Sequence, residues 1–160
     1  HLPFYNVKMP QEKYFKVYKV QYRLAVQDPD MPQPRYHTVI FVETKDDKSG
    51  IIHHVVGDLV TGMTYQRKSG LQPELSQSFY QKHLLGKVKA SKYHTFETIC
   101  AQQPAPHKQK KFNPNTMKTE PIKPNGAFYQ PGETRVRLVK CTEWTEERAI
   151  PALQAAQILE

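Results

Sequence analysis

The sequence predicts an α+β fold, with a mainly antiparallel sheet of roughly four to six strands and helices packed on one face. Three observations lead to this fold class. Runs of alternating β-branched and aromatic residues fill the first half, a turn joins two of them as a hairpin, and helical patterns are confined to two later segments. The chain has 160 residues, 38% of them hydrophobic, which suits one domain with a buried core. We therefore expect a single domain over residues 1–160.

Three strands are expected in the first third of the chain. Residues 14–26 (YFKVYKVQYRLAV) alternate and are rich in β-branched and aromatic side chains, which favours a strand over a helix. The proline-rich residues 28–34 (DPDMPQP) predict a connecting loop. Two further strands, 36–44 (YHTVIFVET) and 51–56 (IIHHVV), flank the turn KDDKSG at 45–50 and predict a β-hairpin.

The middle of the chain adds weaker strands and one helix. Residues 56–68 (VGDLVTGMTYQRK) can supply another strand, and 84–90 (LLGKVKA) form a short strand candidate. Residues 93–103 (YHTFETICAQQ) place their apolar side chains on one helical face and predict a short helix. Thr95 and Ser91 are the candidate capping residues.

The C-terminal part begins with a long proline-rich loop at about residues 103–134, which holds six prolines. A loop of this length in a compact domain is commonly functional or disordered, and it is a candidate gate for a cleft. Residues 135–140 (RVRLVK) predict a strand, and residues 141–160 predict a helix. Pro151 lies inside that helix, so we expect a kink or break there, with Pro151 beginning a second helical piece.

Composition narrows the class of protein. Two cysteines, Cys100 and Cys141, do not make a disulfide scaffold, so an intracellular, reduced and cytoplasmic protein is the simpler expectation. No apolar run approaches the roughly 18 residues of a membrane span, so no transmembrane segment is expected. Residues 1–7 lack the pattern of a secretory signal.

The net charge of +8 raises the question of an anionic partner. The lysines are dispersed, and neither an Arg-rich block nor an aromatic–basic ribonucleoprotein motif is present, so we do not expect nucleic-acid binding. Lysines at 108–111 are expected to face solvent, or to recruit an anionic substrate if the loop folds over a cleft. No C-x-x-C or H-x-x-x-H pair occurs, so we expect no metal site and no cofactor.

Cys141 is the best functional clue. It stands between a predicted strand and a predicted helix, where the helix N-terminus favours a reactive thiolate. A thiol nucleophile also needs a base and a group that orients the base. His37 opens the first hairpin strand and is the candidate base, and His54 on the return strand is its candidate partner. Cys100, which shares a helical face with Phe96, is expected in the core.

Hairpin register leaves the third residue open. Because side chains alternate along a strand, His53 and His54 must point to opposite faces, and only one of them shares the face of His37. A one-residue change in register exchanges the two. Asp58 remains a further candidate for orienting His37.

These residues together resemble a known superfamily. The order of motifs is similar to the circularly permuted branch of the papain-like superfamily, which includes lecithin:retinol acyltransferase-like proteins, PPPDE-type isopeptidases and relatives of NlpC-type cell-wall peptidases. In that branch a His opens a strand, as at 37–42, and the hairpin returns through G-hydrophobic-hydrophobic-His, as at 50–54. The nucleophile then begins a helix as Cys-x-x-aromatic, as at 141–144. The resemblance implies Cys141 as nucleophile, His37 as base and His54 as third polar residue.

The predicted function is that of a cysteine-dependent hydrolase or acyltransferase, similar to a cysteine peptidase, acting on an amide, ester or thioester bond. Its substrate would be a small molecule or a peptidyl or acyl group, and the sequence indicates no oligomeric state. Backbone N–H groups of Cys141 and Thr142 are the candidate oxyanion donors. Thr142 and Trp144 are the candidate substrate contacts, with Trp144 also expected to seat the helix on the sheet. The alternative is a non-catalytic binding domain of the same fold, with a protein or an anionic ligand.

Overall fold

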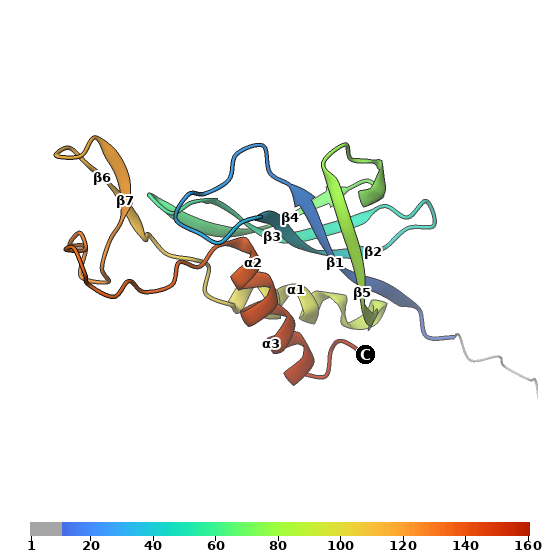
Figure 1. Ribbon diagram of the computed structural model, residues 1–160. Helices are drawn as coiled ribbons and strands as arrows, with labels where there is room; N and C mark the ends of the chain where they lie inside the picture. Colours follow the sequence, from blue (N-terminus) through green and yellow to red (C-terminus); the bar gives the residue numbers. More distant parts are fainter. Residues whose placement is uncertain (1–10) are drawn as a thin grey trace, which may run out of the picture.

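The computed structural model describes residues 11–160, so residues 1–7, where the sequence predicts no secretory signal, lie outside the described part. It contains a five-stranded antiparallel sheet in the order β4-β3-β2-β1-β5 (Figure 1). The strands are β1 (Tyr14–Arg23), β2 (Tyr36–Glu43), β3 (Gly50–Asp58), β4 (Gly62–Gly70) and β5 (Phe79–Lys89). The predicted α+β class and antiparallel sheet are confirmed.

All long helical segments lie on one side of the sheet (Figure 1). The short turn η2 (Ala90–Lys92) leads into α1 (Tyr93–Gln102), and a single-turn element, η1 (Pro73–Leu75), precedes β5. The C-terminal helical run consists of α2 (Cys141–Glu143), η3 (Trp144–Ala149) and α3 (Ile150–Ala155). Within residues 11–160, none of these helices has the length and apolarity to cross a membrane.

Alternation along β2 assigns its side chains to two apolar layers. Ile40 and Val42 face the helices and join the main core, which includes Trp144. Val39 and Phe41 point to the opposite face, where they form a smaller cluster with Val20, Tyr18, Tyr22, Ile52 and Phe79. Because side chains alternate between faces, an odd-numbered residue of β2 belongs to the layer without helices.

The central hairpin opens toward one end of the sheet. β2 and β3 pair only over Ile40–Glu43 and Gly50–His53. Before Ile40, β2 pairs with β1 alone, and beyond His53, β3 pairs with β4 alone. The two strands therefore separate where β2 begins, and this opening positions the candidate site.

Two predictions for the second half of the chain are wrong. The 103–134 segment is not a plain loop, because β6 (Lys110–Asn113) and β7 (Lys118–Pro121) form a two-stranded sheet within it. No strand forms at 135–140. There the amide of Gln109 takes the place of a neighbouring strand: Nε2 donates to the Val139 carbonyl at 2.8 Å, and Oε1 accepts from the Val139 N–H at 2.8 Å.

Predicted helix and strand ends also need correction. β5 begins at Phe79, well before the expected start at 84, since it pairs with β1 up to Tyr22. Neither predicted cap of α1 is used. The N-cap position is Lys92, without a side-chain hydrogen bond, and the Ser91 hydroxyl donates to Glu12 at 2.9 Å.

Pro151 does not break the C-terminal helix. The Ile150 N–H donates to the Thr145 carbonyl, which is the wider π-helical pattern. Pro151 is the second residue of α3 and lies in its first turn, the position of a helical segment that tolerates proline best. The second helical piece thus begins beside Pro151 as expected, but without interruption.

A buried histidine makes the core sensitive to acid. His53 is fully buried, and its ring nitrogens each lie 2.7 Å from a tyrosine hydroxyl, Nδ1 from Tyr65 and Nε2 from Tyr93. Burial, with smaller effects of Arg67 and His54, lowers the pKa of His53 to about 3. The unfolded-state pKa is about 6.5, so the unfolded chain binds the proton first as the pH falls.

We therefore expect His53 to contribute stability that is fully present above about pH 6.5 and is lost progressively as the pH falls from there toward its folded pKa of about 3. Between about pH 7 and pH 5 the loss should be about 2 kcal/mol from this residue. Denaturant unfolding of wild type and His53→Gln at both pH values measures it, because glutamine does not titrate. Equal losses in the two proteins would contradict this assignment.

Candidate functional site

The candidate site lies where β2 and β3 separate, beside the start of the C-terminal helical run. A cavity of about 240 Å³ fills this opening and is lined by both Cys141 and His37. We call it the thiol cavity; its other lining residues are Leu24, Val26, Asp28, Arg35, Tyr36, Val55, Val56, Gly57, Met63 and Lys140. Cys141 begins α2 and is 6% exposed. At this opening Cys141, which comes from the helical side of the sheet, and His37, which points to the opposite face, line the same cavity.

His37 and His54 lie on the same face of the sheet and touch. The pairing of Ile40 with His53 sets Val39 opposite His54, so His37 and His54 are diagonal neighbours. Nε2 of His37 lies 2.9 Å from Nδ1 of His54. This hydrogen bond fixes the plane of the His37 ring and leaves its Nδ1 without a partner among the described residues.

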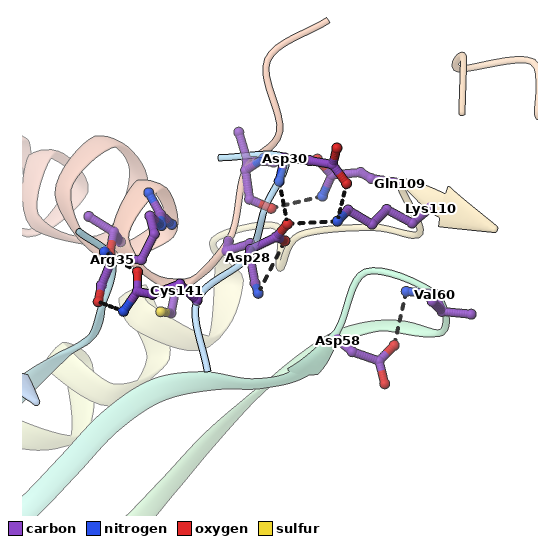
Figure 2. A network of polar contacts seen from close by, with 12 residues as sticks. Asp28, Asp30, Arg35, Asp58, Val60, Gln109, Lys110 and Cys141 are labelled. Atoms are coloured by element: carbon purple, nitrogen blue, oxygen red, sulfur yellow. Dashed lines mark hydrogen bonds and ion pairs between the residues drawn. The ribbon is translucent and has the colours of Figure 1, made fainter. Parts of the chain in front are cut away.

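The other two candidates for the third residue lie elsewhere. His53 points into the main core and is bonded to two tyrosines. The Asp58 carboxylate is occupied by a turn, where its Oδ1 accepts from the backbone N–H groups of Val60 at 2.9 Å (Figure 2) and of Thr61 at 2.8 Å. Of the three, the structure brings only His54 to His37.

Both histidines of the pair favour the neutral form. Burial, and then the positive charge of Lys68, lowers the pKa of His37. Burial lowers the pKa of His54 to about 4, with further effects of His37 and Lys68 and a small opposing one of Gln66. When His37 carries its proton on Nε2, it donates to His54 and its Nδ1 can accept a proton. His54 Nε2 is then a buried donor without a hydrogen-bond partner in residues 11–160.

The start of the C-terminal helical run is tied directly to β2. The Cys141 thiol donates to the Tyr36 carbonyl at 3.7 Å, and the Thr142 hydroxyl lies 2.8 Å from the Thr38 hydroxyl. No hydrogen bond joins Cys141 to His37, although both line the thiol cavity. The contacts of Cys141 and Thr142 with β2 therefore place the candidate nucleophile near the candidate base, without a hydrogen bond between the two.

A buried ion pair fastens the same junction. Arg35 donates to both oxygens of Glu143, at 2.7 and 2.8 Å, and Glu143 also accepts the Lys140 N–H at 2.8 Å. Burial opposes the charge of Glu143, yet the bonds from Arg35 and Lys140 lower its pKa. The hydrogen bonds to Glu143, and then the neighbouring Cys141, raise the pKa of Arg35. The sequence pattern did not predict this pair, whose only trace is an Arg two residues before His37 and an acidic residue two residues after Cys141.

A second polar network connects the loops around Cys141 (Figure 2). Lys110 Nζ lies 2.8 Å from Asp28 and 2.8 Å from Asp30. Asp28 also lies 3.7 Å from the ammonium of Lys140, the residue before Cys141. Lys110 is therefore a buried structural cation, which corrects the expectation that it faces solvent or recruits a substrate.

Trp144 and Cys100 are core residues. Trp144 is fully buried, donates from Nε1 to the Gln103 carbonyl at 3.3 Å and packs against Tyr65. It seats the helix as predicted, while its candidate role as a substrate contact has no support. Cys100 is fully buried, and burial raises the pKa of its thiol to about 12. In the part of the chain that the structure describes, no three His, Cys, Asp or Glu side chains form a metal-binding group.

Comparisons with known proteins give a family and no function. The family of unknown function DUF6540 matches residues 17–160, which include both halves of the candidate site. No curated protein and no solved structure matches the chain.

Proposed function

Since this chain belongs to DUF6540, a family of unknown function, we propose from the geometry that it is a cysteine-dependent hydrolase or acyltransferase acting on an amide, ester or thioester. One observation carries the proposal. His37 is held through Nε2 by His54 at 2.9 Å and lines a cavity together with Cys141, which begins a helix. A nucleophile, a base and a group that orients the base are the parts that thiol acyl transfer needs.

The chemical steps follow from these positions. Nδ1 of His37 takes the proton of the Cys141 thiol, and Sγ forms a bond to the substrate carbonyl carbon. The tetrahedral intermediate collapses, the bond to the leaving group breaks, and His37 gives its proton to that group. Water or another acceptor then attacks the thioester, loses a proton to His37 and displaces the Cys141 thiolate. Hydrolysis and acyl transfer differ only in that acceptor.

The helix start supplies the charge stabilisation. The first-turn amides of Cys141 and Thr142 have no carbonyl partner within the helix, since the first four N–H groups of any helix lack one. They can donate to the oxyanion that forms on the substrate. The bond from the Lys140 N–H to Glu143 fixes the backbone just before them.

For this chemistry the Cys141 thiol must exchange its hydrogen bond to the Tyr36 carbonyl for one to His37. In the structure Cys141 donates to the Tyr36 carbonyl at 3.7 Å, a long and weak contact. Catalytic hydrogen bonds are often long or misaligned without substrate and tighten in the complex. We infer that Sγ turns from Tyr36 toward Nδ1 of His37 when a substrate enters the thiol cavity.

Selective alkylation tests the proposal. We expect iodoacetamide near neutral pH to modify Cys141 quickly and Cys100 slowly, because Cys100 is buried with a raised pKa. The rate at Cys141 should fall by at least about tenfold in His37→Gln and stay unchanged in His83→Gln, a histidine outside the site. Peptide mass spectrometry after timed quenching gives both rates. Equal, slow labelling of the two cysteines would contradict the enzyme proposal.

The second candidate function is a non-catalytic binding domain, and the bond between Cys141 and Tyr36 is the observation that favours it. The two functions differ in covalent chemistry. Incubation with p-nitrophenyl acetate should leave one acetyl group on Cys141 if the site is catalytic. A protein that neither gains an acetyl group at Cys141 nor releases p-nitrophenolate faster than Cys141→Ala supports the binding domain.

A further inference from the structure

The sheet face without helices carries a second, larger cavity. Residues 71–78, which include η1, border an open hollow of about 590 Å³ on the outer surface of the sheet, and we call this space the outer cavity. Val39 and Ile52 belong to its apolar floor, and Leu71 and Leu75 line it from the bordering segment. These two leucines are 73% and 69% exposed. A hollow of this size with an apolar lining is typical of a small-molecule site.

One end of the outer cavity is polar and adjoins the candidate active site. His37 and His54 both line it, and Leu24 and His37 line the thiol cavity as well. The two cavities therefore meet at the base candidate. A substrate whose reactive carbonyl lies by His37 can extend one of its parts into the outer cavity.

The same end carries a free positive charge. Lys68 lines the outer cavity, forms no ion pair with any residue from 11 to 160, and acts electrostatically on both His37 and His54. No Asp or Glu lines this cavity. Arg23, the other cation there, already donates to the Phe79 carbonyl at 2.6 Å and lies over the Tyr80 ring. Lys68 is thus the cation available to a ligand.

We propose that the outer cavity binds the apolar part of the substrate, and that Lys68 receives a carboxylate attached close to the scissile bond. The substrate class is then an apolar acyl group joined to a carboxylate-bearing amine or alcohol, as in an N-acyl amino acid. This assignment rests on the proposed function for its reaction, while its binding can be measured without any reaction.

Binding is tested with N-acylglycines on the Cys141→Ala protein, which cannot form the acyl-enzyme. Calorimetry should show affinity that rises about threefold to fourfold for each added methylene and then levels off when the outer cavity is full. N-decanoylglycine amide, which has the same chain and no charge, should bind about threefold more weakly than N-decanoylglycine. That difference should vanish in Lys68→Gln and persist in Lys45→Gln, a lysine of the β2–β3 turn.

The apolar wall has a matched control. Leu71→Ser combined with Leu75→Ser should weaken N-decanoylglycine binding by about tenfold. Leu84→Ser removes a leucine that is 57% exposed on β5 and lies outside the outer cavity, so it should leave the affinity unchanged. Affinity that does not depend on chain length, or an equal loss in Leu84→Ser, overturns the inference.

The two proposals fail separately. Release of glycine from N-decanoylglycine by the wild-type protein tests the reaction. Tight, chain-length-dependent binding without release of glycine and without turnover of p-nitrophenyl acetate keeps the outer cavity as a ligand site and removes the enzyme. Turnover of p-nitrophenyl acetate without any binding of N-acylglycines keeps the enzyme and overturns the substrate class.

Discussion

Replacing His37 by glutamine should slow the hydrolysis of p-nitrophenyl acetate by about 10²–10⁴-fold, because the thiol of Cys141 then has no base. Cys141→Ala should remove the acyl-enzyme altogether. Residues that act as one unit give losses that do not add. The double variant should therefore be no slower than Cys141→Ala, and this equality is the sharpest evidence that Cys141 and His37 work together.

His54 should act on the rate through His37. The 2.9 Å contact holds the His37 ring, so His54→Gln, whose amide oxygen can still accept from Nε2, should retain more activity than His54→Leu. His83→Gln and Cys100→Ser are the controls that should leave the rate unchanged. A loss in His37→Gln no larger than in His83→Gln, with the folded structure retained, would show that no base operates at this site.

Local alternation was enough to predict the first half of the fold. The hairpin of β2 and β3 could be predicted because strand residues and turn residues follow one another along the chain, and the antiparallel sheet followed from it. The strand expected at 135–140 failed for a reason that no local pattern contains. An extended segment becomes a strand only when a neighbour pairs with it, and here the neighbour is the side chain of Gln109.

The residues of the candidate site likewise divide into those that a local pattern predicts and those that it does not. Sequence placed His37, His54 and Cys141 as candidates, but the choice between His53 and His54 depended on a register that the structure alone supplies, the pairing of Ile40 with His53. Contacts across long stretches of chain could not be predicted. Arg35 and Glu143 are separated by 108 positions, and neither residue belongs to a local motif that requires the other.

That ion pair gives the largest expected effect on stability. The side chains of Arg35 and Glu143 are only 12% and 11% exposed, so Arg35→Met leaves a carboxylate buried without its partner. We expect the free energy of unfolding to fall by about 3–5 kcal/mol. Denaturant unfolding near neutral pH measures the loss.

An exposed ion pair that joins residues 135–140 to the same helical run is the matched control. Arg137 donates to both oxygens of Glu147 at 2.7 Å, but these side chains are 65% and 46% exposed. Water solvates both charges when the pair is broken, so Arg137→Met should leave the free energy of unfolding almost unchanged. Similar losses in Arg35→Met and Arg137→Met would mean that the burial of the first pair has no energetic consequence.

A compensating variant separates stability from positioning. Adding Glu143→Gln to Arg35→Met removes the unpaired charge and keeps an amide oxygen that can accept the Lys140 N–H, so most of the lost stability should return. The double variant would still lack the Arg35 guanidinium, which links the residue before β2 to Glu143 at the helix start. If Cys141 is alkylated more slowly than in wild type both in Arg35→Met and in the stabilised double variant, Arg35 and Glu143 position the thiol beside His37. If alkylation recovers together with stability, the ion pair serves the fold, and the contacts of Cys141 and Thr142 with β2 suffice to place the thiol.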